Sequence, residues 1–444
     1  MKVVSSLILS LLFGLLTKAN VLNKKQGIQT LVLLDDYSIV ESHSIFFDSL
    51  TKDGHSLQYE MISPNPPAIK YYEDYYFDNI ILMAPSVKEF KNPISSNDLI
   101  EFLKANHNIL VFGDADVKKP IRSFANEFGM EFENAGFEVR DYENEKIHNT
   151  ENNVVFSKNF FEPFRKGSNS LFTNPETPIA FSGVGLNLDP KNTFAFPILR
   201  AEPSTFSFNS EQNEVSKKSG EQLTLVAGYQ TRKNQRVAVS GSLGLCSNNH
   251  MLLSLGNNGS LQSSANYVFC KELYQWTFQQ RGVLQISNLR HNKKGEAWTG
   301  VNPENYRILD ELEFNVDIQQ KLPDGSLVPF VGKDIQLEFI KLDPHYRIFL
   351  KQQDTQKATY HADLKAPDAL GVFKFKVTYW RYGYSFLDEE TVVSVIQFRH
   401  DEFPRFLRVA YPYYYNIFIM MGAGFLFTVF FLYSDVGSSK QKQN

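Results

Sequence analysis

The feature that most constrains the fold of this chain is an apolar run at residues 413–433, which contains no charged side chain. An α-helix of 21 residues is about 31 Å long, which matches the hydrocarbon core of a bilayer. Tyrosines cluster at the start of the run and Tyr433 marks its end, as is typical of membrane interfaces. The alternative is a buried core helix, but length and lack of charge favour one transmembrane helix at 413–433.

The N-terminus carries a second, shorter apolar run. Lys2 precedes residues 3–16, which are mostly apolar, and the small residues Thr17 and Ala19 follow. This order is typical of a secretory signal peptide that is cleaved after about Ala19. The alternative is a helix that stays in the membrane, for which the run is short. We predict a signal peptide at 1–19.

Together the two runs predict a single-pass type I membrane protein with a lumenal N-terminus. The tail at 434–444 is then cytosolic, and it carries Lys440 and Lys442 at the third and fifth positions from its end. This spacing resembles the KxKxx retrieval signal of the endoplasmic reticulum, which is read by a receptor and does not anchor the protein. The alternative is an ordinary basic flank. We expect residence in the endoplasmic reticulum membrane.

Small residues interrupt the apolar run at Gly422, Ala423 and Gly424. Small side chains let another helix approach closely in lipid. The three residues lack the spacing of a GxxxG face, so they indicate helix packing without specifying a dimer.

Composition excludes some functions of the intervening part, which is about 390 residues long and long enough for two or three domains. The net charge is −4 and both signs are interspersed, so no basic stripe for nucleic acid is present. The chain has two cysteines, Cys246 and Cys270. They could form a disulfide in an oxidising lumen or remain two buried thiols, and the sequence leaves both open.

The hydrophobic pattern changes twice along this part. Residues 26–150 alternate short apolar runs with helical patterns, which predicts an α/β doubly wound domain of the flavodoxin or amidotransferase type. Residues 151–283 form a β-rich middle region ending in a helix, with Pro, Asn and Ser between short runs. Residues 284–408 alternate apolar and polar residues and predict a membrane-proximal β-sandwich.

Carboxylates follow two of the predicted parallel strands. Asp35 and Asp36 follow the first strand, and Asp114 and Asp116 follow the fourth. Such positions can hold Mg²⁺ near a phosphate, or they can cap helices and turns. No phosphate-binding glycine loop accompanies them, so we predict no metal site.

Other motifs are incomplete. The nine histidines show no metal-ligand spacing. Ser242 lies in a near miss for a nucleophile elbow, because Ser240 replaces the first glycine of that motif. Gly183 and Gly185 begin a dinucleotide-like pattern that does not continue. Asn258 begins an N-glycosylation sequon and is a candidate for modification. We predict no catalytic, cofactor-binding or metal-binding residue.

Whole segments resemble the family of 48 kDa subunits of the eukaryotic oligosaccharyltransferase. The matching segments lie along the mature chain and include TLVLLDD (30–36), FDNIILMAPSV (77–87), FSGVGLNLDP (181–190), KDIQLEFIKLDPHYRIFL (333–350), GVFKFKVTYWRYGYSFL (371–387) and AYPYYYNIFIMM (410–421). The resemblance implies a non-catalytic subunit of the complex that transfers a preassembled glycan from dolichyl diphosphate to Asn in Asn-x-Ser/Thr of nascent proteins.

The resemblance also implies partners: the catalytic polytopic subunit, ribophorin I, ribophorin II and a small membrane subunit. It implies an N-terminal domain similar to glutamine amidotransferases, but no cysteine precedes Cys246, so their nucleophile is absent. The role expected is in complex assembly and in substrate positioning, without a cofactor. The alternative is a stand-alone lumenal carbohydrate-binding receptor or enzyme.

Overall fold

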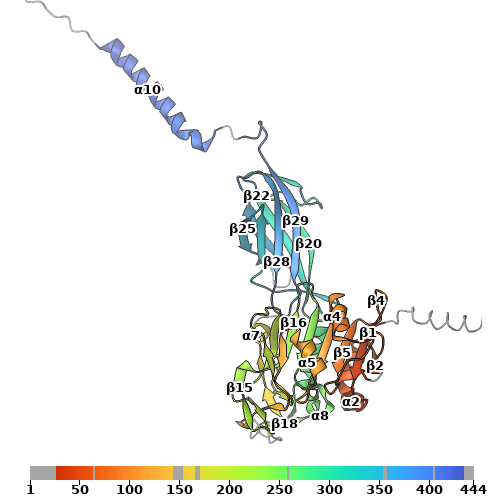
Figure 1. Cartoon of the computed structure of the whole chain (residues 1–444). Helices are drawn as coiled ribbons and strands as arrows, with labels where there is room; N and C mark the ends of the chain where they lie inside the picture. Colours follow the sequence, from red (N-terminus) through yellow and green to blue (C-terminus); the bar gives the residue numbers. More distant parts are fainter. Residues whose placement is uncertain are drawn as a thin grey trace, which may run out of the picture.

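The computed structural model describes residues 27–63, 66–143, 154–165, 171–257, 260–353, 358–403 and 406–434. Three parts follow one another along the chain (Figure 1): an α/β domain at 27–281, a β-sandwich at 282–396, and a C-terminal helix. The predicted fold class, an α/β sheet followed by β-rich structure and one apolar helix, is confirmed. The predicted signal peptide, Asn258, Lys440 and Lys442 lie outside the described residues.

Five parallel strands form the centre of the α/β domain. Their order in the sheet is β2 (His55–Met61), β1 (Ile28–Leu34), β5 (Asn79–Met83), β6 (Asn108–Phe112) and β17 (Arg236–Ser240). The strands β5, β6 and β17 are buried along their whole length, as strands covered on both faces should be. The surrounding helices are α2 (Ser38–Ser42), α3 (Ser44–Lys52), α4 (Ser96–Lys104), α5 (Lys119–Asn126) and α9 (Asn266–Thr277).

The same sheet continues into the predicted middle region. Strand β17 pairs with β16 (Thr224–Gln230), and the path runs on through β13 (Ala195–Arg200) to β10 (Asn159–Phe160); β12 (Leu186–Leu188) and β7 (Met130–Phe132) form a side branch. The boundary that we placed at residue 150 therefore divides strands of one ten-stranded sheet. The reason is that β17 covers the free edge of β6, so the middle region completes the first sheet.

Smaller elements surround this sheet. They are β3 (Lys70–Tyr71), β4 (Asp74–Tyr75), β8 (Phe137–Arg140), β9 (Val155–Ser157), α7 (Glu162–Arg165), β11 (Ile179–Phe181), β14 (Phe206–Asn209), β15 (Glu214–Ser219), η1 (Gly220–Gln222), η2 (Gly244–Cys246), α8 (Asn248–Met251), β18 (Ser254–Asn257) and β19 (Ser260–Ser263).

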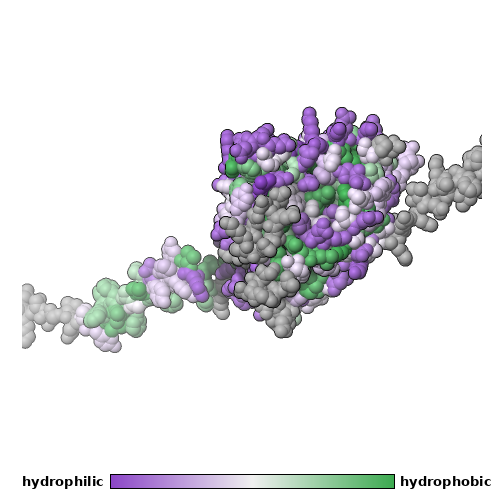
Figure 2. All heavy atoms as spheres, turned by 90° about the horizontal axis from the view of Figure 1, so that it is seen from below, coloured by the Kyte–Doolittle hydropathy of each residue, from purple (hydrophilic) through white to green (hydrophobic). Residues whose placement is uncertain are grey.

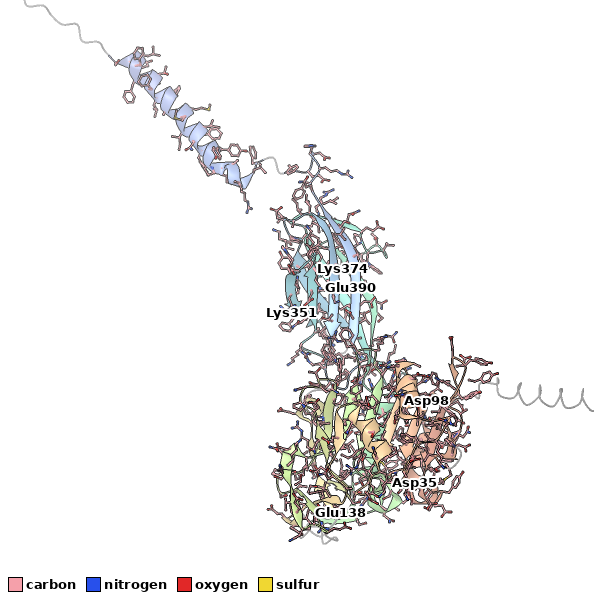
Figure 3. The ribbon with its side chains drawn as sticks, in the orientation of Figure 1. Asp35, Asp98, Glu138, Lys351, Lys374 and Glu390 are labelled. Carbon is pink, nitrogen blue, oxygen red and sulfur yellow. A yellow bond between two sulfur atoms is a disulfide. The ribbon has the colours of Figure 1, made fainter. Side chains whose placement is uncertain are left out.

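The sandwich consists of two five-stranded sheets. One contains β20 (Val283–Lys293), β22 (Glu311–Lys321), β27 (Thr359–Lys365), β26 (Lys351–Gln352) and β23 (Leu327–Pro329). The other contains β21 (Asn305–Arg307), β29 (Leu387–Ile396), β28 (Gly371–Tyr379), β24 (Gln336–Ile340) and β25 (Pro344–Phe349). On β28, Phe373 and Phe375 are buried while Lys374 is exposed beside Glu390 on the outer face (Figure 3).

Hydrogen bonds fix the sandwich to the α/β domain. Arg236, at the start of β17, is fully buried and donates to the carbonyls of Trp276, Arg281 and Gly282. Trp276 in α9 donates from Nε1 to the carbonyl of Gly383 at 2.9 Å. The amino ends of the parallel strands therefore face the sandwich, and their carboxyl ends lie at the far end of the α/β domain.

The last elements are η3 (Arg408–Ala410) and α10 (Tyr411–Tyr433). The most apolar 18-residue window of the segment 408–433 has a mean hydropathy of 1.9, and none of this window is buried within the protein. Helix α10 extends away from the sandwich (Figure 1), and its hydrophobic side chains are exposed (Figure 2). It is long enough, at about 34 Å, to span a bilayer.

Candidate functional site at the carboxyl ends of the parallel strands

The natural ligand position of a doubly wound sheet is the carboxyl edge, where the strand order reverses. Here the reversal lies between β1 and β5, because β1 pairs with β2 on one side and with β5 on the other. Asp35 and Asp36 follow β1, and Asp114 lies two residues after β6. Figure 3 places Asp35 and Glu138 toward the end of the α/β domain that is away from the sandwich, and many hydrophilic side chains cover this end (Figure 2).

The two carboxylates after β1 bind neighbouring loop groups. Asp35 Oδ2 accepts a hydrogen bond from the backbone N–H of Ser86 at 3.1 Å, across the point where the strand order reverses. Asp36 accepts from the hydroxyl of Ser38 at 2.7 Å and from its backbone N–H at 3.2 Å. These bonds from Ser38 lower the pKa of Asp36. Both carboxylates therefore hold the turn into α2 and the loop after β5.

The carboxylates after β6 have a similar role. Asp114 Oδ1 accepts from the backbone N–H of Ala115 at 2.8 Å, and Asp116 forms an exposed ion pair with Lys118 at 2.7 Å. Burial raises the pKa of Asp114, and the nearby charges of Glu138, Asp116 and Asp35 raise it further. Within the described ranges, no group of three or more His, Cys, Asp or Glu side chains is placed where it could hold a metal ion.

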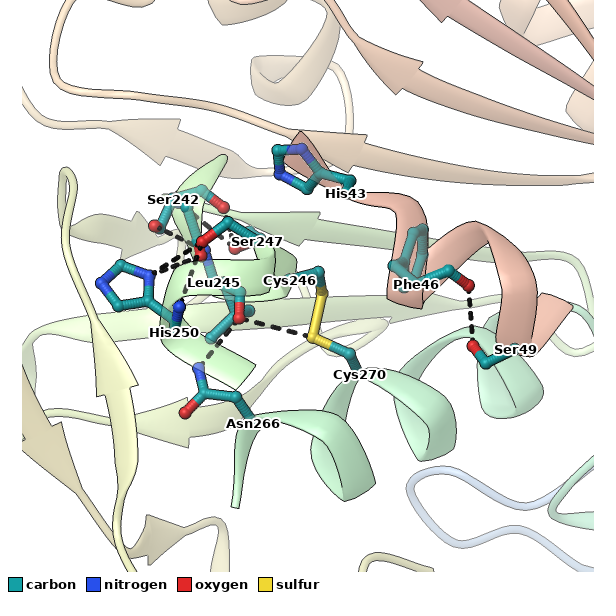
Figure 4. Close-up of a disulfide and its surroundings, with 12 residues drawn as sticks. His43, Phe46, Ser49, Ser242, Leu245, Cys246, Ser247, His250, Asn266 and Cys270 are labelled. Atoms are coloured by element: carbon teal, nitrogen blue, oxygen red, sulfur yellow. Dashed lines mark hydrogen bonds between the residues drawn. A yellow bond between two sulfur atoms is a disulfide. The ribbon is translucent and has the colours of Figure 1, made fainter. Parts of the chain in front are cut away.

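Ser242 follows β17 at the same edge but is not paired with a histidine. Its hydroxyl is buried, donates to the carbonyl of Ser182 and accepts from the N–H of Leu245 at 3.1 Å. The two nearby imidazoles bond to backbone: His43 Nε2 donates to the carbonyl of Leu243 at 3.0 Å, and His250 Nδ1 donates to the carbonyl of Gly244. Burial lowers the pKa of both histidines. These contacts shape the 242–250 loop and do not activate Ser242 as a nucleophile (Figure 4).

The glycines near this loop have a packing role. A Cβ on Gly241 would lie 1.9 Å from the carbonyl oxygen of Val184, and one on Gly183 would lie 2.2 Å from that of Gly241. The backbone N–H of Val184 donates to the carbonyl of Gly241 at 2.9 Å. The pattern at Gly183 and Gly185 therefore belongs to a close backbone crossing.

A disulfide joins Cys246 in η2 to Cys270 in α9, with Cα atoms 5.9 Å apart (Figure 4). Beside it, Asn266 donates from its side-chain amide to the carbonyls of Leu245 and Ala180. The sequence left open whether the two cysteines meet. In the structure they connect the loop after β17 to α9, so the bridge stabilises the same loop as the histidines.

One polar cavity was not foreseen from the sequence. It is lined by Glu131, Phe132, Glu133, Asn134, Phe137, Asn187 and Ser216. The Glu133 side chain is buried, and its Oε1 accepts from Ser216 while its Oε2 has no protein partner. The alternation Met130-Glu131-Phe132-Glu133 was the available signal, since it puts both acids on the side away from Met130 and Phe132, and Glu133 follows directly after β7.

The small residues of the apolar run lie in the middle of α10. Residues two positions apart on an α-helix point about 200° away from each other, so Gly422 and Gly424 lie on nearly opposite faces. Gly424 instead shares a face with Thr428, whose hydroxyl donates to the Gly424 carbonyl at 2.8 Å. A close helix contact at Gly424 would therefore include Thr428 and exclude Gly422.

The matches to known protein families together cover nearly the whole chain. One family model, the OST48 N-terminal domain, matches residues 22–280, and a second, the OST48 middle domain, matches residues 290–435. Three relatives carry the name dolichyl-diphosphooligosaccharide–protein glycosyltransferase 48 kDa subunit. The chain is 33% identical to the relative from Danio rerio over 411 residues, 91% of each chain. It is also 33% identical to those from Arabidopsis thaliana over 420 residues and Caenorhabditis elegans over 414 residues, covering 91% of this chain and 92% and 91% of the relatives.

Solved structures match far less well. The carbohydrate deacetylase Agd3 aligns with 64% of this chain and 35% of its own, at 10% identity and a TM-score of 0.32. A putative ThuA-like protein from Parabacteroides merdae aligns with 57% of this chain and 90% of its own, at 11% identity and a TM-score of 0.29. Neither likeness supports a conclusion about function.

Proposed function

The chain belongs to the OST48 family, the 48 kDa subunits of dolichyl-diphosphooligosaccharide–protein glycosyltransferase, and we propose that it is a non-catalytic subunit of that enzyme. Its role is to hold neighbouring subunits and to help position the acceptor chain during transfer of a glycan to Asn in Asn-x-Ser/Thr. The single observation that carries this proposal is the direction of the α/β sheet, whose carboxyl edge faces away from the membrane-anchored end.

The direction matters because a glycan carried on dolichyl diphosphate reacts close to the bilayer. The seven-residue strand β1 is about 23 Å long and the ten-residue strand β29 about 33 Å long. The sandwich lies between the carboxyl edge and α10 (Figure 1). Asp35, Asp36, Asp114 and Asp116 are therefore roughly 50 Å from the end of the sandwich that leads to the membrane.

The reaction itself demands groups that those carboxylates are poorly placed to supply. Moving a glycan from a diphosphate to an amide needs a metal or an acid at the leaving group and a carboxylate at the asparagine. Asp35 is bonded to Ser86 in the loop after β5, and Asp36 is bonded to Ser38 in its own loop. The span at Tyr411–Tyr433 has no ionisable side chain other than tyrosines. Catalysis then resides in another subunit.

The proposed partners are the catalytic polytopic subunit, ribophorin I, ribophorin II and a small membrane subunit. The proposed topology is type I, with the α/β domain and the sandwich in the lumen of the endoplasmic reticulum, and Asn258 is a proposed glycosylation site. Lys440 and Lys442 form the proposed retrieval signal. Replacing both with serine should let unassembled protein acquire Golgi-type glycans, and unchanged retention would argue for retention by the span.

Affinity purification of the tagged full-length protein in mild detergent tests the function. We expect a large membrane complex that contains the catalytic subunit and transfers glycan to an acceptor peptide. Depleting the protein should cause widespread underglycosylation together with loss of partner subunits. A protein that purifies alone, and whose depletion leaves glycosylation unchanged, would support a stand-alone receptor or enzyme instead.

A further inference from the structure

The end of the sandwich that leads to α10 carries a group of exposed apolar side chains. Strands β20, β24, β27 and β29 end there and β22, β25 and β28 begin there, as their antiparallel pairing requires. We name this end the apex and define its apolar residues as Leu309, Leu342, Leu370, Val372 and Ile396, all of which are exposed. Leu342, in the turn between β24 and β25, is 92% exposed.

Backbone contacts bring the apex loops together although they are distant in sequence. The N–H of Ile308 donates to the carbonyl of Ile396 at 3.0 Å, and the N–H of Leu309 donates to that of Ala366 at 3.1 Å. Lys341 Nζ donates to the carbonyl of Leu370 at 2.7 Å. Four chain segments therefore place apolar side chains on one small surface. An exposed apolar group of this kind usually marks an interaction surface.

The linker between β29 and α10 is bonded to the apex and also carries exposed apolar side chains. Glu402 forms an ion pair with Arg307 at the end of β21 and accepts a hydrogen bond from the N–H of Arg399. After Glu402 the described linker residues include exposed Phe403, Phe406, Leu407 and Val409. Apolar residues thus continue from the apex to the first turn of the membrane helix.

The length of the linker limits how far the apex can lie from the bilayer. Helix α10 begins at Tyr411, and the chain from Glu402 to Tyr411 can extend by at most about 32 Å. Four tyrosines at 411–415 mark the interfacial end of the helix. A linker with exposed phenylalanines is less stable fully extended in water than close to the bilayer, because its side chains gain free energy by entering the interface.

We propose that the apex docks on the lumenal leaflet, with Leu342 and Leu370 inserted at the level of the lipid headgroups and upper acyl chains. Charges of both signs lie near them, since Lys341 and Asp343 flank Leu342 and Asp368 precedes Leu370 by two residues. In the other sheet, Lys293 pairs with Asp310 and Lys294 with Asp363. The expected partner is therefore the apolar interior of a neutral bilayer surface and not an anionic headgroup. Docking would hold the sandwich upright and set the height of the α/β domain above the membrane.

The test uses the full-length chain, reconstituted without partner subunits in nanodiscs of phosphatidylcholine. The natural cysteines are joined in the structure, so Leu342→Cys offers one free thiol for an environment-sensitive fluorophore. The matched control is Leu327→Cys, an exposed leucine at the opposite end of the sandwich. Because both side chains are exposed, neither substitution should disturb folding, which thermal unfolding of each variant can verify.

We expect the label at 342 to emit at a shorter wavelength in nanodiscs than the same dye does in water. Lipids that are brominated on their acyl chains should also quench its fluorescence. The label at 327 should show neither effect. Equal, water-like emission at both positions would overturn the proposal. A second measurement uses the same label in the assembled complex. Emission at a shorter wavelength only there, without quenching by the brominated lipids, would also overturn the proposal, because the apex would then contact another subunit.

Discussion

His291 is a buried histidine in the core of the sandwich. Its Nδ1 shares a hydrogen bond of 2.7 Å with the hydroxyl of Tyr306, its ring stacks on Phe375, and its Nε2 is buried without a partner. Burial lowers the pKa of His291 to about 4 from 6.5. The folded protein therefore keeps this imidazole neutral at a pH where the unfolded chain takes up a proton.

This pKa shift predicts a loss of stability in mild acid. Between pH 6.5 and 4 the unfolded state binds more protons at His291, so the free energy of unfolding falls as the pH falls. At pH 5 the loss from this one group is about 2 kcal/mol. Chemical denaturation at pH 7 and pH 5 should show a smaller difference for His291→Phe than for the unchanged protein.

The control for that experiment is His345→Phe, which removes an exposed histidine from β25. If the free energy of unfolding depends on pH equally in His291→Phe, in the control and in the unchanged protein, the account of His291 as a neutral, buried imidazole is contradicted.

Single residues also show where sequence reasoning reaches its limit. The positions of Asp35 and Asp114 after their strands followed from the local pattern, because strand ends are visible in the sequence. The partners of these carboxylates did not follow, because Ser86 approaches Asp35 from a different loop. Glu133 was missed for the same reason: its burial depends on Ser216, which is 83 residues further along the chain.

At the scale of elements, the disulfide joins η2 to α9 across 24 residues of sequence. Closing a loop of that length restricts the unfolded chain by about 3.5 kcal/mol in the chain-entropy account. We expect the double variant Cys246→Ala/Cys270→Ala to unfold at lower denaturant concentration, by a free energy of about that size.

A reducing agent provides the matched control for the disulfide. It should lower the stability of the unchanged protein and have no effect on the double alanine variant. If the disulfide is reduced and the unchanged protein is as stable as before, the bridge contributes nothing to stability.

Helix α10 offers a pair of glycines for comparison. Gly424 shares a face with Thr428, and Gly422 lies on nearly the opposite face. If a partner helix packs at Gly424, then Gly424→Leu should reduce the partner subunits that co-purify in mild detergent, because the side chain holds the two backbones apart. Gly422→Leu should leave recovery close to that of the unchanged protein. Equal recovery from both variants would show that this face contacts lipid.

Elements were predictable where their pattern is local. The parallel strands, the sandwich strand β28 and the apolar helix each carry a clear period or length in the sequence. The pairing of β17 with β6 was not predictable, because Val237 and Ile109 are far apart in sequence and both strands are buried along their whole length. The boundary at residue 150 followed a real change of pattern, but strands from both sides of it belong to one sheet, because β17 pairs with β6 and continues into β16.

At the scale of the whole molecule, the α/β domain and the sandwich behave as one unit. Arg236 donates to three carbonyls at their junction, and burial lowers its pKa to about 9, which still leaves it charged at neutral pH. Gln230 adds a bond from Nε2 to the carbonyl of Tyr384 at 3.0 Å. The carboxyl edge of the sheet is therefore held at a fixed distance from the apex.

The most direct test of the non-catalytic role is glycan transfer by assembled complexes that carry Asp35→Asn/Asp36→Asn or, separately, Asp114→Asn/Asp116→Asn. Each complex is purified with its full set of partners, and transfer to an acceptor peptide is measured against the unchanged complex. We predict rates within a few-fold of the unchanged complex, because these carboxylates hold loops and lie at the far end from the membrane. A fully assembled complex that loses activity by about 10³-fold, the size expected when a principal electrostatic group is removed, would contradict the account and place this chain in the active site.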